Sequence, residues 1–172
     1  MLAVLVTHLI AVHLHVAPAT ASDDWVQAQL RVANEKLAPL DVSLTFAATD
    51  DAAPARIETR AARDALDAGL TAGAIDVFVT GYLQDLDAAR GIYGVTWHHD
   101  GHTYLILSAE AWPRTFAHEL GHFFGLPHSD DPASLMNADP PAEPPPDSRE
   151  FLPGELRVMR ATRNRLLRRK AI

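Results

Sequence analysis

The sequence predicts an α+β protein in which a mainly parallel β-sheet is followed by one amphipathic helix and a loop-rich C-terminal part. Residues 74–80 form a near-continuous apolar run between Gly73 and Gly81, which is typical of a strand buried on both faces, as in parallel sheets. Strand-like and helix-like segments alternate before this run. Beyond Pro127 the chain reads as loop, with seven prolines between Pro132 and Pro153. We therefore expect a β-α-β layer first and an irregular region after it.

The first strand is expected at residues 10–17, where apolar residues alternate with His13 and His15. In this strand the two histidines would lie on the solvent side, and we do not expect them to be ligands. The alternative is a signal peptide, because residues 1–14 are apolar and residues 19–21 resemble a small-residue cleavage site. No Lys or Arg precedes the apolar run, which favours the strand.

The next segments predict a helix, a strand and a loop. Ser22 can cap a helix that has Asp23 and Asp24 in its first turn and an apolar face as far as about residue 36. Pro39 ends this helix, and residues 42–46 alternate as a second strand. A loop at residues 50–54 precedes a short alanine-rich segment.

The second half predicts two more strands and two more helices. Residues 93–97 and 103–108 are strand patterns on either side of a polar turn at residues 98–102. A helix is expected from about Trp112 to Phe124, because Pro113 suits its first turn and Gly125 its end. A final helix is expected to start near Pro153.

Composition limits the classes of function. The 172 residues are 48% hydrophobic and 22% charged, as in an ordinary globular protein, and the length predicts one domain over residues 1–172. The absence of cysteine excludes disulfides, thiolate metal sites and thiol nucleophiles. Nine histidines make imidazole and carboxylate the metal ligands to expect. A net charge of −7 argues against a nucleic-acid binder, and no apolar run predicts a transmembrane segment.

The charge is unevenly distributed along the chain. The first 156 residues carry a net charge of −14, and seven of the fifteen basic residues follow Leu156. We expect a terminal helix with a solvated basic face that docks on an acidic body. A contact with a membrane surface or with nucleic acid is the alternative.

The most informative segment is residues 118–128, with the sequence HELGHFFGLPH. On a helix, His118 and His122 leave the same face and can bind one ion, while Glu119 is rotated by about 100° and lies beside that ion. Gly125 can turn the chain sharply, so that His128 returns as a third ligand. Three imidazoles on zinc leave the fourth position to water, as in catalytic sites.

This segment resembles the metzincin signature, in which three histidines are followed by a methionine turn. Here Met136 lies eight residues after His128. Within the metzincins, the sequence HSDDPASLM at residues 128–136 is similar to the matrixin (matrix metalloproteinase) branch. The chain lacks the propeptide cysteine, has no recognisable histidine-and-glycine loop for further ions, and has Asn-Ala-Asp after Met136. We therefore expect a compact, matrixin-like metzincin without a propeptide.

The resemblance implies a zincin-like metzincin fold, with a mixed, mainly parallel five-stranded sheet packed on the active-site helix. An upper subdomain would span residues 9–127, and a small irregular lower subdomain, residues 128–172, would end in the C-terminal helix. The implied activity is zinc-dependent endopeptidase, with one Zn²⁺ bound by His118, His122 and His128 and with Glu119 as general base. Met136 would form the floor beneath the histidines.

The family also implies how a peptide would bind. Substrate would pair with an edge strand, here residues 103–108, so that Tyr104, Leu105 and Ile106 would contact it. Thr115 would line the pocket for the residue after the cleaved bond. We expect a monomer that acts on a protein or peptide, binds no nucleic acid and, like most metzincins, is secreted or extracellular.

Three alternatives remain open at the level of sequence. His98, His99, Asp100 and His102 are either ordinary turn residues or ligands of a second ion. The zinc domain could be a weak or inactive peptide-binding module, although Glu119, the residue that such a module would most readily lose, is present. It could also be an interaction domain that acts through the basic C-terminal helix, with zinc only stabilising the fold.

Overall fold

The computed structural model describes residues 7–138, 145 and 148–172. Residues 1–6, where the signal-peptide alternative would begin, and Asp139, after the expected methionine turn, lie outside the described residues. Across the described part of the chain, no helix is long and apolar enough to cross a membrane.

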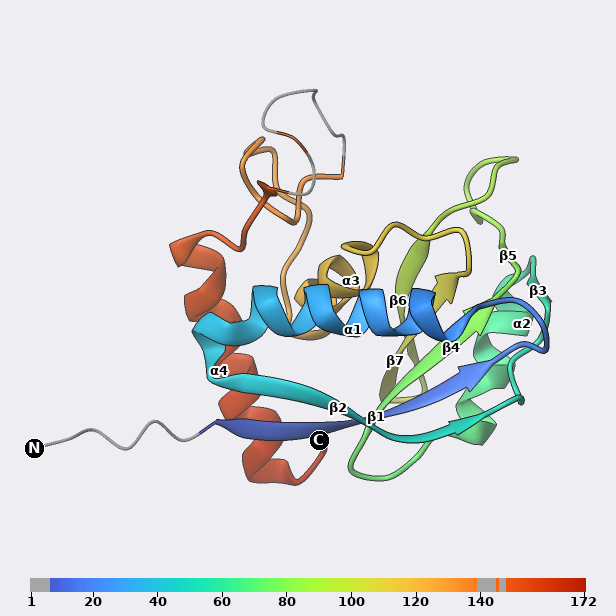
Figure 1. Ribbon diagram of the computed structural model, residues 1–172, viewed down its shortest axis with the longest axis horizontal. Coiled ribbons are helices and arrows are strands. Elements are labelled where there is room, and N and C mark those ends of the chain that lie inside the picture. Colours follow the sequence, from blue (N-terminus) through green and yellow to red (C-terminus); the bar gives the residue numbers. More distant parts are fainter. Residues whose placement is uncertain (1–6, 139–144, 146–147) are drawn as a thin grey trace, which may run out of the picture.

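A five-stranded, mainly parallel sheet forms the centre of the molecule (Figure 1). Its strands are, in spatial order, β2 (Val42–Asp50), β1 (His8–Val16), β4 (Ile75–Thr80), β7 (His102–Ser108) and β6 (Gly94–His99). The first four are parallel neighbours, and β6 pairs with β7 in the antiparallel direction. The predicted α+β fold class with its mixed, mainly parallel sheet is confirmed.

The prediction that residues 103–108 form an edge strand is wrong. Strand β7 lies between β4 and β6, so both of its edges are paired and β6 is the edge strand. Tyr104, Leu105 and Ile106 are fully buried, which excludes them from contact with substrate in this structure. The alternation of apolar and polar residues along a strand does not reveal whether that strand lies at the edge of the sheet or inside it.

Helices α1 (Asp23–Leu37) and α3 (Thr115–Phe123) cover one face of the sheet (Figure 1). The Ser22 side chain caps α1 by accepting a hydrogen bond of 3.2 Å from the Trp25 amide. After α1, a 3₁₀ turn (Ala38–Leu40) leads into β2. Apolar residues of both helices and of four strands form one buried cluster with Met136 and Met159.

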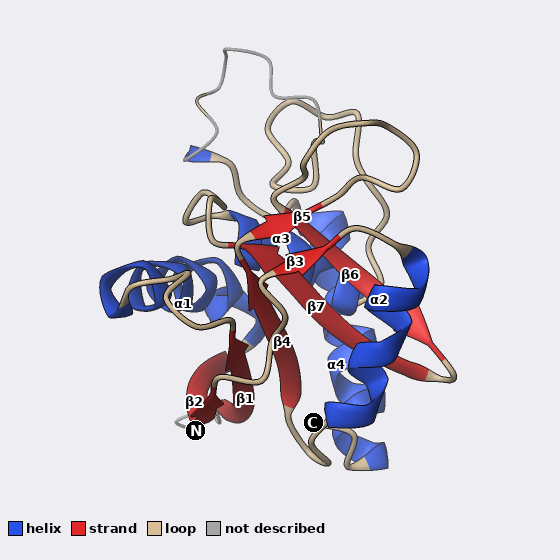
Figure 2. Ribbon diagram, turned by 90° about the vertical axis from the view of Figure 1, so that its right-hand side faces the viewer, coloured by secondary structure: helices blue, strands red, loops and turns tan. Residues whose placement is uncertain are grey.

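A smaller layer covers the opposite face of the sheet (Figure 2). It contains the short strands β3 (Arg56–Ile57) and β5 (Tyr82–Leu83), helix α2 (Arg60–Asp64) and a 3₁₀ helix (Ala65–Gly69). This layer buries Phe78, Trp97 and Tyr104. The expectation that His15 faces solvent is therefore wrong, since His15 is buried and stacks on Phe78.

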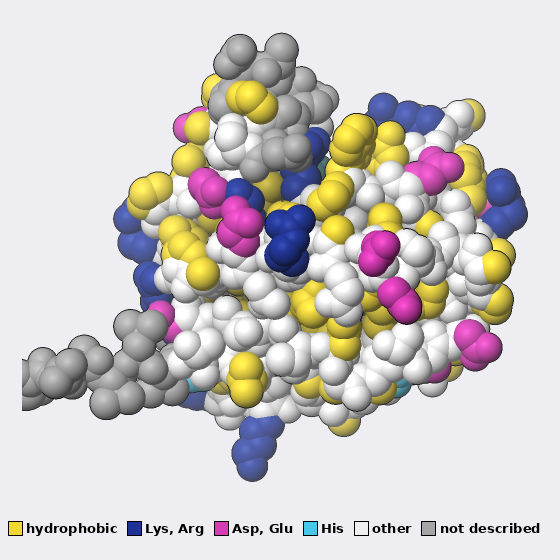
Figure 3. All heavy atoms as spheres, viewed as in Figure 1, with side chains coloured by type: hydrophobic (Ala, Val, Ile, Leu, Met, Phe, Trp, Pro, Cys, Tyr) yellow, Lys and Arg dark blue, Asp and Glu magenta, His cyan; other side chains and the backbone are white. Residues whose placement is uncertain are grey.

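The C-terminal helix α4 (Pro153–Arg169) begins at the proline where the sequence predicted it. Part of its basic character holds it in place. Arg160 donates a hydrogen bond of 2.8 Å to the Pro39 carbonyl, and the buried Arg163 donates to the Leu40 carbonyl. In Figure 3 further basic side chains lie along the left edge of the molecule, where Figure 1 shows α4.

Candidate metal centre

Helix α3 and the loop after it bring three histidines together. His118 and His122 lie one turn apart on α3, and Gly125, with φ of +93°, turns the chain so that His128 returns toward them. The ring centroids of the three histidines are 4.7 to 5.4 Å apart. One nitrogen of each ring lies within 4.8 Å of the other two, which is a spacing that a single ion can bridge.

Backbone carbonyls fix two of these rings. His118 Nδ1 lies 2.8 Å from the Leu135 carbonyl, and His122 Nδ1 lies 2.7 Å from the Leu126 carbonyl. Because a carbonyl only accepts, each Nδ1 carries a proton, and the lone pair of a neutral ring is then on Nε2. Histidines that bind metals are typically held by such hydrogen bonds on the other ring nitrogen.

Burial keeps the same rings neutral. It lowers the pKa of His118 to about 4, against the opposing effect of the hydrogen bond to Leu135, and it also lowers the pKa of His122. Neutral imidazole is the form that binds a metal, because the protonated ring has no lone pair to offer. The donor set, its spacing and its protonation therefore fit zinc, which binds imidazole nitrogens.

The Glu119 carboxyl lies beside the three histidines and is almost fully buried. Burial raises its pKa to about 7, although hydrogen bonds from Thr96 act in the opposite direction. The Thr96 hydroxyl is 3.0 Å from Glu119 Oε2 and 2.7 Å from the Glu119 carbonyl. A Cβ at Gly94 would lie 2.9 Å from Glu119 Cγ, so the glycine is required where β6 passes this close to the carboxyl.

Met136 lies fully buried beneath α3. A Cβ at Gly121 would be only 2.2 Å from Met136 Sδ, so the helix contacts the methionine with its backbone at this position. The Asn137 amide donates to the Ser134 carbonyl over 3.1 Å and closes a tight turn around Met136, while the Ser129 amide donates to the Met136 carbonyl over 3.0 Å. Met136 thus lies against the histidine-bearing helix, and its role as a floor beneath the bound ion stays a prediction from the resemblance.

Sequence reasoning missed the residues that hold this turn. The buried Ser134 hydroxyl accepts a hydrogen bond of 2.9 Å from the Met136 amide and donates one of 2.6 Å to Glu155 Oε1. Glu155 Oε2 in turn accepts from the Leu152 amide at the start of α4. The sequence carried one usable signal, since a glutamate three residues after a helix start often binds the backbone there.

Cavities lie on both sides of the histidines. One, of about 760 Å³, extends along β6 toward Arg60 and Asp85 and is lined by Glu119, His122 and His128. The other, of about 410 Å³, lies between Trp112 and Asn137 and is lined by residues of the same centre and by Thr115. Thr115 therefore lies at the wall of a cavity beside the three histidines, and its part in a substrate pocket stays a prediction.

The turn at residues 98–102 does not gather its four polar residues at one point. His98 contacts Thr103, and His102 contacts Asp67, at 2.9 and 2.5 Å. His99 and Asp100 could share an ion with Asp67, but Asp100 is 80% exposed. The suggestion of a second ion bound by all four residues loses its support.

Several solved structures resemble this chain in fold. An archaemetzincin from Methanopyrus kandleri superposes with a TM-score of 0.66 at 14% identity, over 90% of this chain and 96% of that one. Metalloproteinase-II from Bacteroides fragilis gives 0.67 at 12% identity, over 90% of this chain and 52% of the other. A zinc-dependent peptidase from Methanocorpusculum labreanum gives 0.53 at 19% identity, over 87% and 99%.

The chain has a metzincin-like zincin fold. It spans about half the length of the Bacteroides neighbour and nearly all of the two archaeal ones. No protein-family model and no curated protein sequence matches the chain. The matrixin branch stays a prediction from the residues that follow His128.

Proposed function

We propose that this protein is a zinc-dependent endopeptidase of the metzincin type. The observation that carries the proposal is the convergence of three imidazoles beside one buried carboxyl, at the junction of two cavities. The metzincin-like zincin fold supports it, and the solved structures that share this fold include a metalloproteinase and a zinc-dependent peptidase. The sequence HSDDPASLM at residues 128–136, which resembles the matrixin pattern, supports a matrixin-like branch as part of this proposal.

Each residue of the centre then has a defined part. Bound zinc would lower the pKa of a water molecule toward about 7 and polarise the carbonyl of the peptide bond. Glu119 takes the proton of the attacking water and passes it to the departing amine. Thr96 holds the carboxyl in place through the 3.0 Å hydrogen bond to Oε2. The carbonyls of Leu135 and Leu126 orient His118 and His122.

Strand β6 is the natural place for a peptide to bind. It is the sheet's edge on the side of the metal centre, and residues 94–98 line the larger cavity together with Glu119. An extended peptide that pairs with this edge gains backbone hydrogen bonds, while side-chain pockets provide selectivity. We therefore assign to β6 the pairing with substrate that was expected of residues 103–108.

The test is cleavage of a peptide library, read by mass spectrometry, with the parent and with Glu119→Gln. Loss of a general base typically costs about 10²–10⁴-fold in rate. We expect Glu119→Gln to keep its zinc and its fold and to lose most of its activity. Glu110→Gln is the matched control, because Glu110 is an exposed glutamate outside both cavities and should leave the rate unchanged.

Two results would contradict the proposal. A parent that binds library peptides but never cleaves them would indicate a binding module instead of an enzyme. A Glu119→Gln protein that retains more than about a tenth of the parent rate would assign the proton transfer to another group.

A further inference from the structure

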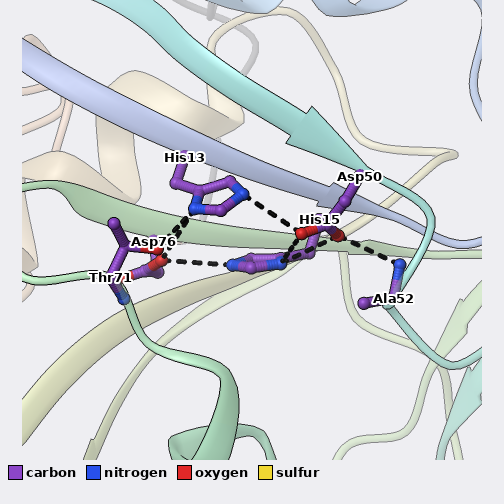
Figure 4. A network of polar contacts seen from close by, with 6 residues as sticks. All are labelled: His13, His15, Asp50, Ala52, Thr71 and Asp76. Atoms are coloured by element: carbon purple, nitrogen blue, oxygen red, sulfur yellow. Dashed lines mark hydrogen bonds and ion pairs between the residues drawn. The ribbon is translucent and has the colours of Figure 1, made fainter.

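A second group of potential ligands lies on the opposite face of the sheet from α3. His13 and His15 project from β1 toward Asp50 at the end of β2 and Asp76 near the start of β4 (Figure 4). His13 Nε2 is 3.1 Å from Asp50 Oδ2, and His15 Nδ1 is 3.0 Å from both oxygens of Asp50. His13, His15 and Asp50 offer ligand atoms that all lie within 4.8 Å of one another.

A β-bulge brings these residues into register. Between β1 and β2 the pairing moves from Val12 opposite Phe46 to His13 opposite Ala48, so that His15 comes to lie opposite Asp50. Without this shift His15 would face Thr49, whose side chain is no carboxylate. Bulges occur preferentially where a strand must re-aim a side chain, often beside functional sites.

The remaining ring nitrogens are held by the protein. His15 Nε2 lies 3.1 Å from Asp76 Oδ1, and His13 Nδ1 contacts the Thr71 hydroxyl. Asp76 is itself buried and accepts a hydrogen bond of 3.0 Å from the Thr71 amide. Each histidine therefore has one nitrogen fixed by a protein group and the other directed at Asp50. Metal-binding histidines are held in this way, by a carboxylate or another acceptor on the far nitrogen.

Charge and access also suit a cation. Two carboxylates face two imidazoles, and a divalent ion would balance the two negative charges. His15 and Asp76 are buried, whereas the Asp50 side chain is 39% exposed, which leaves an approach for an ion from solvent. The nitrogen–oxygen separations of 3.0 and 3.1 Å are close to the separation of about 3.4 Å between ligands of tetrahedral zinc.

We propose that His13, His15 and Asp50 bind a second divalent transition-metal ion, and that Asp76 and Thr71 orient its histidine ligands. Imidazole with carboxylate is a ligand set for zinc, iron, copper or nickel, whereas calcium and magnesium prefer oxygen ligands alone. The ion would join β1, β2 and β4 on the side of the sheet away from the first centre. The proposal is independent of the peptidase function, because the two sites share no residue.

The test counts zinc ions per chain by mass spectrometry, after stripping with a chelator and dialysis against Zn²⁺. We expect two ions in the parent, one in His118→Ala/His122→Ala and one in His13→Gln. Combining these substitutions should leave none. His13 and Asp50 are partly exposed, so His13→Gln and Asp50→Asn can be made without replacing the buried His15. Circular dichroism verifies the fold of each variant.

His99→Gln is the matched control, since His99 is a partly exposed histidine in a separate group of possible ligands that includes Asp67 and Asp100. It should keep two ions. Cobalt absorption in His118→Ala/His122→Ala gives a second readout, and its d–d bands should disappear in the combined variant with His13→Gln. The proposal is overturned if the parent binds one ion and His118→Ala/His122→Ala binds none, or if His99→Gln alone loses the second ion. A failure of the first centre would differ, because His118→Ala/His122→Ala would then bind as much zinc as the parent.

Discussion

Gly121 lets α3 lie directly on Met136. A glycine inside a helix costs about 1 kcal/mol relative to alanine, so its presence in α3 needs a packing reason. That reason is the space occupied by Met136 Sδ, 2.2 Å from where a Cβ would be, with Phe151 Cε1 at 3.0 Å. Both neighbours are buried and cannot move into solvent.

Gly121→Ala should therefore destabilise the protein despite its better helix propensity. Overpacking of this kind typically costs about 1–3 kcal/mol. Urea unfolding of the variant measures it, with Gly69→Ala as control, because a Cβ at Gly69 would meet nothing within 4 Å. Gly121→Ala combined with Met136→Ala should cost less than the sum of the two single changes. Equal stability of Gly121→Ala and Gly69→Ala would show that the contact is not tight.

Met136 itself should act through its volume and not as a ligand. A thioether is a poor partner for zinc beside three imidazoles. Met136→Leu keeps the volume and should cost less than about 1.5 kcal/mol. Met136→Ala should cost about 2–5 kcal/mol, because the fully buried site cannot fill the space. Thermal melts with and without zinc compare them. If both variants melted like the parent, Met136 would not be a packed floor.

The methionine turn is tied to α4 by one hydroxyl. The Ser134 hydroxyl accepts a hydrogen bond from the Met136 amide and donates one to Glu155. The first turn of α4 and the turn below the histidines therefore share a hydrogen-bond network. The Leu135 carbonyl within the same turn holds His118. The position of the C-terminal helix is thereby linked to the orientation of a metal ligand.

Ser134→Ala should lower both the stability and the zinc affinity. A buried amide or carboxylate without a partner costs about 1–3 kcal/mol. Loss of support behind a ligand weakens metal binding by about tenfold or more. Unfolding in urea and zinc competition with a chromogenic chelator measure the two effects. Ser148→Ala is the control, because the Ser148 hydroxyl is exposed and donates to the Pro145 carbonyl three residues earlier. If the two variants had the same stability and the same zinc affinity, the turn would not support the metal centre.

The positions of the helices and strands along the chain were predictable from local patterns, whereas the order of the strands in the sheet and the layer packed on it were not. The cap at Ser22, the prolines at 39 and 153 and the apolar run at 75–80 mark helices and strands through short-range chemistry. The grouping of the three histidines was predictable because a helix turn and a glycine bend fix their relation, whereas Met136 was assigned only through the resemblance to the metzincin signature. The interior position of β7 was not, since strand order depends on contacts distant in sequence. The burial of His15 was missed for the same reason, because the covering layer comes from residues 53–70.

At the scale of the molecule, the sheet separates two layers. The layer with α1 and α3 carries the first centre. The layer with α2 is joined to the sheet by polar contacts at its margin: the Tyr104 hydroxyl donates to the Arg63 carbonyl over 2.8 Å, and Trp97 Nε1 donates to Asp64 over 2.8 Å. Arg63 also stacks over the Trp97 ring and lines the larger cavity. The contacts that attach this layer to the sheet therefore form one end of the larger cavity.

Alkaline pH should loosen this attachment through Tyr104. Burial raises the pKa of Tyr104 to about 12, and the charges of Asp67 and Asp64 act in the same direction. The unfolded chain loses the tyrosine proton near pH 10, before the folded protein does, so the stabilisation is complete below pH 10 and is lost as pH rises toward 12. A shift of this size corresponds to about 2–3 kcal/mol. The free energy of unfolding in urea, measured between pH 9 and about 11.5 for the parent and Tyr104→Phe, isolates this contribution, because the other tyrosines, lysines and arginines titrate in both proteins. The parent should lose stability more steeply than Tyr104→Phe, and parallel curves would show that Tyr104 ionises in the folded protein as it does in water.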